Sequence, residues 1–92
     1  MRRLGRLVRN PAVADVEVAG DIFLVAPRTQ DVIRLNRIAG ALWRYLARPR
    51  EHDDIVAVFA AAFPQVRRAR LSRDLAKGIA ELRRRGLIVA IS

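Results

Sequence analysis

Few side chains in this sequence can perform catalysis. His52 is the only histidine, Thr29 is the only threonine, and cysteine is absent. No Ser/His/Asp or Cys/His set can therefore be assembled, and disulfides, thiolate metal sites and thiol nucleophiles are excluded. The five glycines form no phosphate-binding loop. The sequence therefore predicts a protein that is not an enzyme and that carries no cofactor.

Two groups of ionisable residues have suitable types for chemistry but unsuitable placement. His52 precedes Asp53 and Asp54, yet three adjacent residues at the start of a helix point in different directions, which disfavours a shared metal ion. We interpret them as a helix-start cluster, because acids favour the positive end of a helix. Asp15 and Glu17 alternate with apolar residues, so we interpret them as the solvated face of a strand rather than an acid–base pair.

The net charge of +9 is concentrated in two parts of the chain. Residues 1–12 contain four arginines and no acid, and residues 67–85 contain seven arginines and Lys77 against Asp74 and Glu81. Such basic zones favour an anionic partner, which would be an acidic peptide, a nucleic acid or a membrane surface. A solvated arginine-rich surface is the alternative interpretation.

No segment has the features of a membrane span or an export signal. The longest uncharged stretch, residues 55–66, is well short of the roughly 20 residues that cross a bilayer. The basic N-terminus leads into no apolar run of signal-peptide length. We expect a cytoplasmic protein that does not bind membranes.

One domain with a short N-terminal arm is expected from the length and patterning of the chain. Residues 1–12 lack clean periodicity and end at the turn signal Asn10-Pro11. We interpret them as a basic and flexible arm. Residues 13–92 form the domain.

Three strands are predicted at the beginning of the domain. Ala14–Val18 and Ile22–Ala26 flank Gly20-Asp21, which is a two-residue hairpin signal, and Val32–Leu35 follows a second turn. We expect an antiparallel meander whose third strand is an edge. The unpaired backbone groups of such an edge can accept another strand.

Three helices are predicted after the strands. Asn36 has the side chain and the position of an N-cap for the first helix, which stops before Pro49. The second helix fits Asp53–Phe63. The third fits Ala69–Arg85, and Gly86 is the residue type expected just beyond a helix end.

The order of these elements predicts an α+β fold, in which a three-stranded antiparallel sheet is followed by three helices (βββααα). Trp43, in the first helix, is expected in the core rather than in a ligand-stacking role, because tryptophan buries a large area. Leu87–Ile91 is either a short terminal strand or an apolar tail.

Several stretches of the chain together carry a family resemblance. They are VEVAGDIFLVA, VIRLNRIAGALWRYL, the second helix with its acidic start, and LAKGIAELRRRGLI. From about residue 10 to residue 90 the chain resembles the PqqD-like family, the recognition elements of ribosomally synthesised and modified peptides. The most specific part is the order Leu35-Asn36, Gly40 and Trp43.

The resemblance implies a winged-helix-like domain that binds the leader segment of a precursor peptide and delivers it to a modifying enzyme. A radical SAM enzyme, a leader peptidase and a cyclase are all possible recipients. The leader would add as a strand along the third strand and pack in the groove between that strand and the third helix. Carried onto this sequence, the candidate peptide-binding residues are Asp31, Val32, Ile33, Arg34 and Leu35 in the strand, and Arg70, Asp74, Lys77, Gly78 and Glu81 in the helix.

Two other interpretations stay open at the level of sequence. The basic third helix fits a DNA-binding winged helix, but only seven residues follow Arg85, and a wing hairpin usually follows the recognition helix. Peptide recognition is therefore favoured over nucleic-acid binding. The open edge and an apolar sheet face also allow a homodimer.

Overall fold

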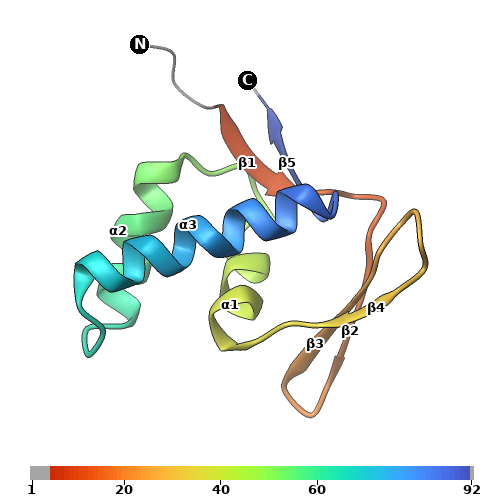
Figure 1. Ribbon diagram of the computed structural model, residues 1–92, viewed down its shortest axis with the longest axis horizontal. Helices are drawn as coiled ribbons and strands as arrows, with labels where there is room; N and C mark the ends of the chain where they lie inside the picture. Colours follow the sequence, from red (N-terminus) through yellow and green to blue (C-terminus); the bar gives the residue numbers. More distant parts are fainter. Residues whose placement is uncertain (1–4, 92) are drawn as a thin grey trace.

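The computed structural model describes residues 5–91 of the 92-residue chain. It contains five strands and three helices among these residues (Figure 1). In chain order they are β1 (Arg6–Arg9), β2 (Ala14–Val18), β3 (Asp21–Val25), β4 (Val32–Arg34), α1 (Arg37–Tyr45), α2 (His52–Ala62), α3 (Arg68–Arg84) and β5 (Ile88–Ile91). The predicted α+β fold and its βββααα order are confirmed, with one further strand at each end.

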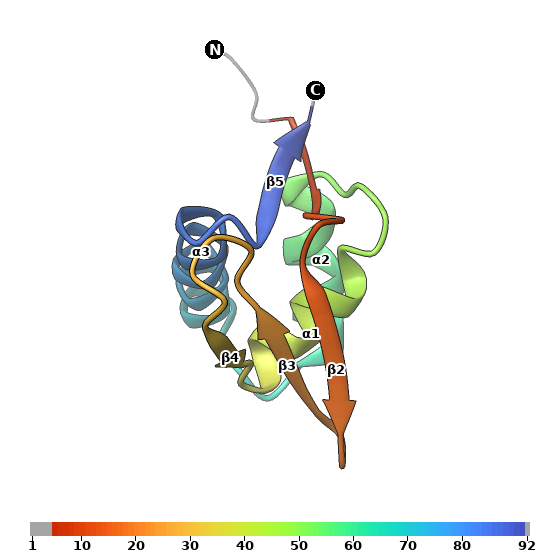
Figure 2. The ribbon, with the colours of Figure 1, turned by 90° about the vertical axis from the view of Figure 1, so that its right-hand side faces the viewer.

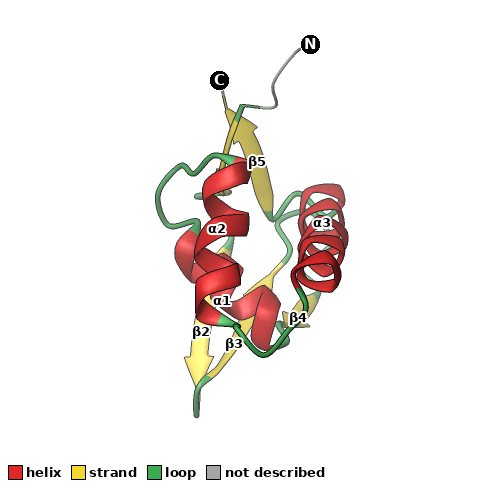
Figure 3. Cartoon of the chain, turned by 90° about the vertical axis from the view of Figure 1, so that its left-hand side faces the viewer, coloured by secondary structure: helices red, strands yellow, loops and turns green. Residues whose placement is uncertain are grey.

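The strands form two antiparallel sheets. The larger sheet has the order β2-β3-β4, and the smaller sheet pairs β1 with β5. The helices cover one face of the larger sheet, and α3 lies beside β4 (Figures 2 and 3). The third strand of the meander is therefore an edge, as predicted, and its free side is turned toward α3.

The first strand corrects the interpretation of residues 1–12 as a flexible arm. Leu7 is 1% exposed, and its N–H donates to the Arg50 carbonyl at 2.8 Å. β1 also pairs with β5 along its whole length, so Leu87–Ile91 contributes a strand rather than a tail. The prediction failed because β1 buries only Leu7 and pairs with a segment at the other end of the chain. Residues 1–4 lie outside the described residues.

The second strand faces the helices with the side opposite to the one predicted. Asp15 accepts a hydrogen bond from Trp43 Nε1 at 2.8 Å, and Glu17 forms an ion pair with Arg44. Val16 and Val18 point outward and are each 55% exposed. The reason is chemical: α1 presents an indole N–H and a guanidinium to β2, and a buried indole N–H requires an acceptor.

The core joins the sheet to the three helices. Trp43 is 1% exposed, which confirms its predicted place in the core. The Asn36 side chain accepts from the Ala39 N–H at 2.8 Å, so the predicted N-cap of α1 is also confirmed. Gly86 has φ +72° at the end of α3, a conformation that glycine adopts without strain. None of the helices within residues 5–91 is long and apolar enough to cross a membrane.

Candidate functional site

The free edge of β4 is the first component of the candidate site. The Leu35 N–H donates to the Ile22 carbonyl, and the Ala26 N–H donates to the Asp31 carbonyl, both at 2.9 Å. Backbone groups alternate in direction along a strand, so Val32 and Arg34 direct their N–H and C=O groups away from β3. Within the described chain no strand pairs with this edge.

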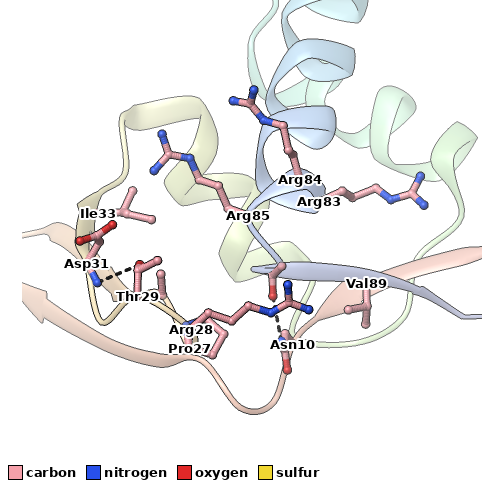
Figure 4. Close-up of a pocket in the computed structure, with 12 residues that line it drawn as sticks. Asn10, Pro27, Arg28, Thr29, Asp31, Ile33, Arg83, Arg84, Arg85 and Val89 are labelled. Atoms are coloured by element: carbon pink, nitrogen blue, oxygen red, sulfur yellow. Dashed lines mark hydrogen bonds between the residues drawn. The ribbon is translucent and has the colours of Figure 1, made fainter.

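A hollow of about 490 Å³ lies between the N-terminal end of β4 and the C-terminal end of α3 (Figure 4). We call it the upper hollow. It is lined by the β3–β4 loop, by Ile33 of β4, by Asn10 and Val89, and by three consecutive arginines with the glycine that follows them, Arg83, Arg84, Arg85 and Gly86.

A second hollow of about 430 Å³, the lower hollow, lies between the start of α1 and the middle of α3. The α1 side supplies Asn36, Ile38, Ala39 and Leu42, and the α3 side supplies Asp74, Leu75, Lys77, Gly78 and Glu81. Glu81 also accepts a hydrogen bond at 2.8 Å from Arg85, which lines the upper hollow. The two hollows thus follow one face of α3, and we call them together the β4–α3 groove.

Only some of the strand residues proposed from the sequence line this groove. Asp31 and Ile33 line the upper hollow. Val32 contributes only its backbone to the edge, since its side chain stands on the outer sheet face and is 67% exposed. The Arg34 guanidinium forms an ion pair with the Asp21 carboxylate at 3.1 Å. Leu35 is buried in the core.

The helix residues proposed from the sequence are brought together, with one exception. Asp74, Lys77, Gly78 and Glu81 all line the lower hollow. Arg70 lines neither hollow and lies 3.8 Å from the Asp74 carboxylate. A Cβ atom placed on Gly78 would meet no atom within 4 Å, so the helix surface is open there.

Most of the residues at the upper end of the groove were not among the candidate site residues predicted from the sequence. Arg28 and Thr29 belong to a loop that was interpreted only as a turn, and the three arginines at the end of α3 carried no site prediction. Asn10 could not be found from the sequence at all. Its side-chain amide donates to the Gly86 carbonyl at 2.8 Å, which ties the N-terminal segment to the end of α3.

The charges in the groove are unevenly compensated. The pKa of the Glu81 carboxyl is lowered, first by the hydrogen bond from Arg85 and also by the nearby charge of Arg84. Arg28 and Arg83 have no acidic partner within residues 5–91. The upper hollow therefore retains positive charge.

The described residues contain no grouping suited to hold a metal ion. His52 and the two aspartates after it open α2, where both acids lie in the first turn, as the helix-start interpretation predicts. The arrangement offers hydrogen-bonding backbone, apolar hollows and charge, which are the means of binding an extended peptide.

Comparisons with known proteins agree with this geometry. Residues 21–88 match the family model described as coenzyme PQQ synthesis protein D (PqqD). The fold is shared with TbiB1 in complex with the TbiA(beta) leader peptide, at TM-score 0.78 and 20% identity over 92% of this chain and 98% of that chain. It is also shared with a lasso peptide synthetase B1 complexed with its leader peptide, at TM-score 0.74 and 19% identity over 90% of this chain and 96% of that chain.

No curated protein matched the chain in sequence. The PqqD family model nevertheless extends from the first residue of β3 to the first residue of β5 and so includes β4 and α3, the two sides of the groove. The resemblance found in the sequence is confirmed: this chain belongs to the PqqD family.

Proposed function

We propose that this protein binds the leader segment of a ribosomally synthesised precursor peptide and delivers it to a modifying enzyme, without catalysing a reaction itself. The observation that carries the proposal is the unpaired edge of β4 beside an open groove along α3. Two proteins of the same fold have been solved with leader peptides bound, which supports this kind of ligand.

The leader is expected to add to β4 as a fourth strand of the larger sheet. Its backbone would exchange hydrogen bonds with the N–H and C=O groups of Val32 and Arg34. In this mode the main chain supplies affinity and the alternating side chains supply specificity. Side chains on one face of the leader would enter the groove beside Ile33, and those on the other face would stand next to Val32.

Delivery is the second half of the proposal. Binding along β4 and α3 leaves the outer face of the larger sheet and the surface of α2 free for contact with an enzyme. A radical SAM enzyme, a leader peptidase or a cyclase would each gain a substrate held in an extended conformation. We place this step in the cytoplasm, because ribosomal precursors originate there.

DNA binding is not proposed. α3 buries Leu71, Leu75, Ile79 and Leu82 against the core, and its groove-lining face carries Asp74 and Glu81. These acids interrupt the face that a recognition helix would present to phosphates.

The proposal is tested by titrating the isotope-labelled full chain with the leader of a precursor encoded beside it. Amide NMR shifts are expected to concentrate at residues 31–35 and along α3. Random duplex DNA at two salt concentrations is the control. Shifts confined to residues 1–12, or binding to DNA alone that is lost as salt rises, would contradict the proposal.

A further inference from the structure

The edge of β4 by itself does not determine how a guest strand lies on it. A strand edge offers the same N–H and C=O groups to parallel and antiparallel partners. A slip of one residue in register exchanges the two faces of the guest. The side chains of the groove must therefore select the direction and the register of the bound peptide.

The two hollows of the groove differ in charge. The upper hollow is lined by four arginines against one aspartate, Asp31. The lower hollow is lined by two acids against one lysine. Because the hollows lie at opposite ends of β4, a guest strand meets positive charge at one end and, at the other, two acids that are each paired with arginines of α3.

The positive charge of the upper hollow is not fully neutralised by acids of the described chain. Glu81 accepts hydrogen bonds from both Arg84 and Arg85, so one carboxylate serves two guanidinium groups. Arg28 forms no ion pair with any residue in the described part of the chain. Figure 4 shows Arg85 extending from α3 toward Ile33 and Asp31, and Arg28 extending from its loop toward Asn10.

The remaining lining of the upper hollow is partly apolar. Ala26, Pro27, Ile33 and Val89 contribute to it. A side chain that enters there meets both aliphatic surface and guanidinium groups. A glutamate or aspartate matches both properties, since its methylene groups contact apolar surface and its carboxylate accepts charge-assisted hydrogen bonds from arginine.

We propose that the upper hollow binds an acidic side chain of the leader through Arg28 and Arg85, and that this contact fixes the direction and register of the guest strand. The inference rests on the proposed function and adds the chemistry that the peptide must carry. Reversed binding would move the acid away from Arg28 and Arg85 to the lower hollow, where Lys77 is the one cation in the lining and stands among two acids. Partly exposed ion pairs have modest energies, so the contact selects an orientation and the backbone and apolar contacts supply most of the affinity.

The test draws its peptides from a random library, so it does not require the natural leader. A phage-displayed library of random dodecapeptides is panned on the immobilised full chain and on the variant Arg28→Glu/Arg85→Glu. The wild type is expected to enrich Asp or Glu at a fixed distance from an apolar pattern. The variant is expected to enrich Lys or Arg at the same position. Changing that acid to lysine in a synthetic peptide should weaken binding to the wild type about tenfold and restore binding to the variant.

Controls separate charge at the groove from charge in general. Arg48→Glu/Arg67→Glu makes the same change in net charge at exposed residues that line neither hollow, and it should enrich the same acidic peptides as the wild type. Arg28→Glu alone changes only the loop, so it tests the charge of the hollow without disturbing the end of α3. Thermal unfolding of every variant checks that it is folded.

Each outcome has a definite meaning. Enrichment of the same acid by the wild type and by Arg28→Glu/Arg85→Glu, or of an apolar pattern with no charge preference, overturns the role of Arg28 and Arg85 but leaves strand addition intact. Failure of the wild-type protein to enrich any peptide contradicts the proposed function as well.

Discussion

Replacement of Gly78 by alanine is expected to stabilise the free protein and to weaken its complex with the leader. Glycine within a helix costs about 1 kcal/mol relative to alanine. Gly78 lies in the interior of α3, where a new Cβ atom would meet nothing within 4 Å. Nothing in the chain therefore opposes the gain in helix stability, and the melting temperature should rise by about 4 to 8 °C for a domain of this size.

The opposite effect on binding follows from the position of Gly78 in the lower hollow. A methyl group there would occupy space that the leader fills in the complex. Inserting a methylene into a packed region typically costs about 1 to 3 kcal/mol, which corresponds to an affinity loss of roughly fivefold to more than a hundredfold. The open space beside Gly78 has no role in the stability of the free protein, so its expected use is close approach by the guest.

The assay combines thermal unfolding with calorimetric titration of the leader. A matched control is the double variant Ala76→Gly/Gly78→Ala, because Ala76 is exposed on α3 outside both hollows. The double variant keeps one glycine in the helix, so its stability should be close to that of the wild type while its affinity stays low. Unchanged or tighter leader binding by Gly78→Ala would refute the packing of the leader on α3 at this point.

Three further predictions concern the edge strand, the second strand and acid stability. Val32→Pro removes an N–H that points away from β3, so leader affinity measured by titration should fall about tenfold for one lost hydrogen bond, with little change in melting temperature; equal affinity would exclude pairing at Val32. Asp15→Ala leaves the buried Trp43 N–H without its acceptor and should lower the free energy of unfolding by about 1 to 3 kcal/mol. Val16→Ala, at an exposed site, should change that free energy by no more than about 0.5 kcal/mol. Both variants are measured by denaturant unfolding, and a larger loss for Val16→Ala than for Asp15→Ala would contradict the assigned face of β2. The folded state holds the pKa of Glu81 below its ordinary value of 4.5, so its contribution to stability is present above that pH and is lost as the pH falls through the lowered pKa. Glu81→Gln should therefore lose less stability than the wild type in acid unfolding below pH 4.5, and an identical loss would show that the Arg85 contact has no effect on folding.

The local elements were predictable because their signals are short-range. Asn36 occupies the position at which a strand can pass directly into a helix, and its side chain makes the N-cap bond that its type favours. Gly86 ends α3 in the left-handed conformation for which glycine is suited. A hairpin between β2 and β3 was also predicted, but its turn residues are Ala19 and Gly20, both with positive φ, rather than Gly20 and Asp21, because Asp21 pairs with Val18 in the ladder.

The errors arose where long-range contacts outweighed local pattern. The alternation of β2 predicted valines inward and acids outward, but Trp43 and Arg44 on α1 make the acid-bearing face the one that packs. β1 was not predicted because its partner strand, β5, lies at the opposite end of the chain. No window of a few residues contains either interaction.

By itself the sequence determined a small α+β domain with an edge strand and a basic third helix. Those properties depend on residue types and on spacing along the chain. Only the tertiary structure decided which face of α3 turns toward β4. It also joined Arg28, Asn10 and Arg85, which are far apart in sequence, around one hollow. A groove is a relation between surfaces that the packing of Trp43 and its neighbours brings together, so its lining cannot be derived from any one segment.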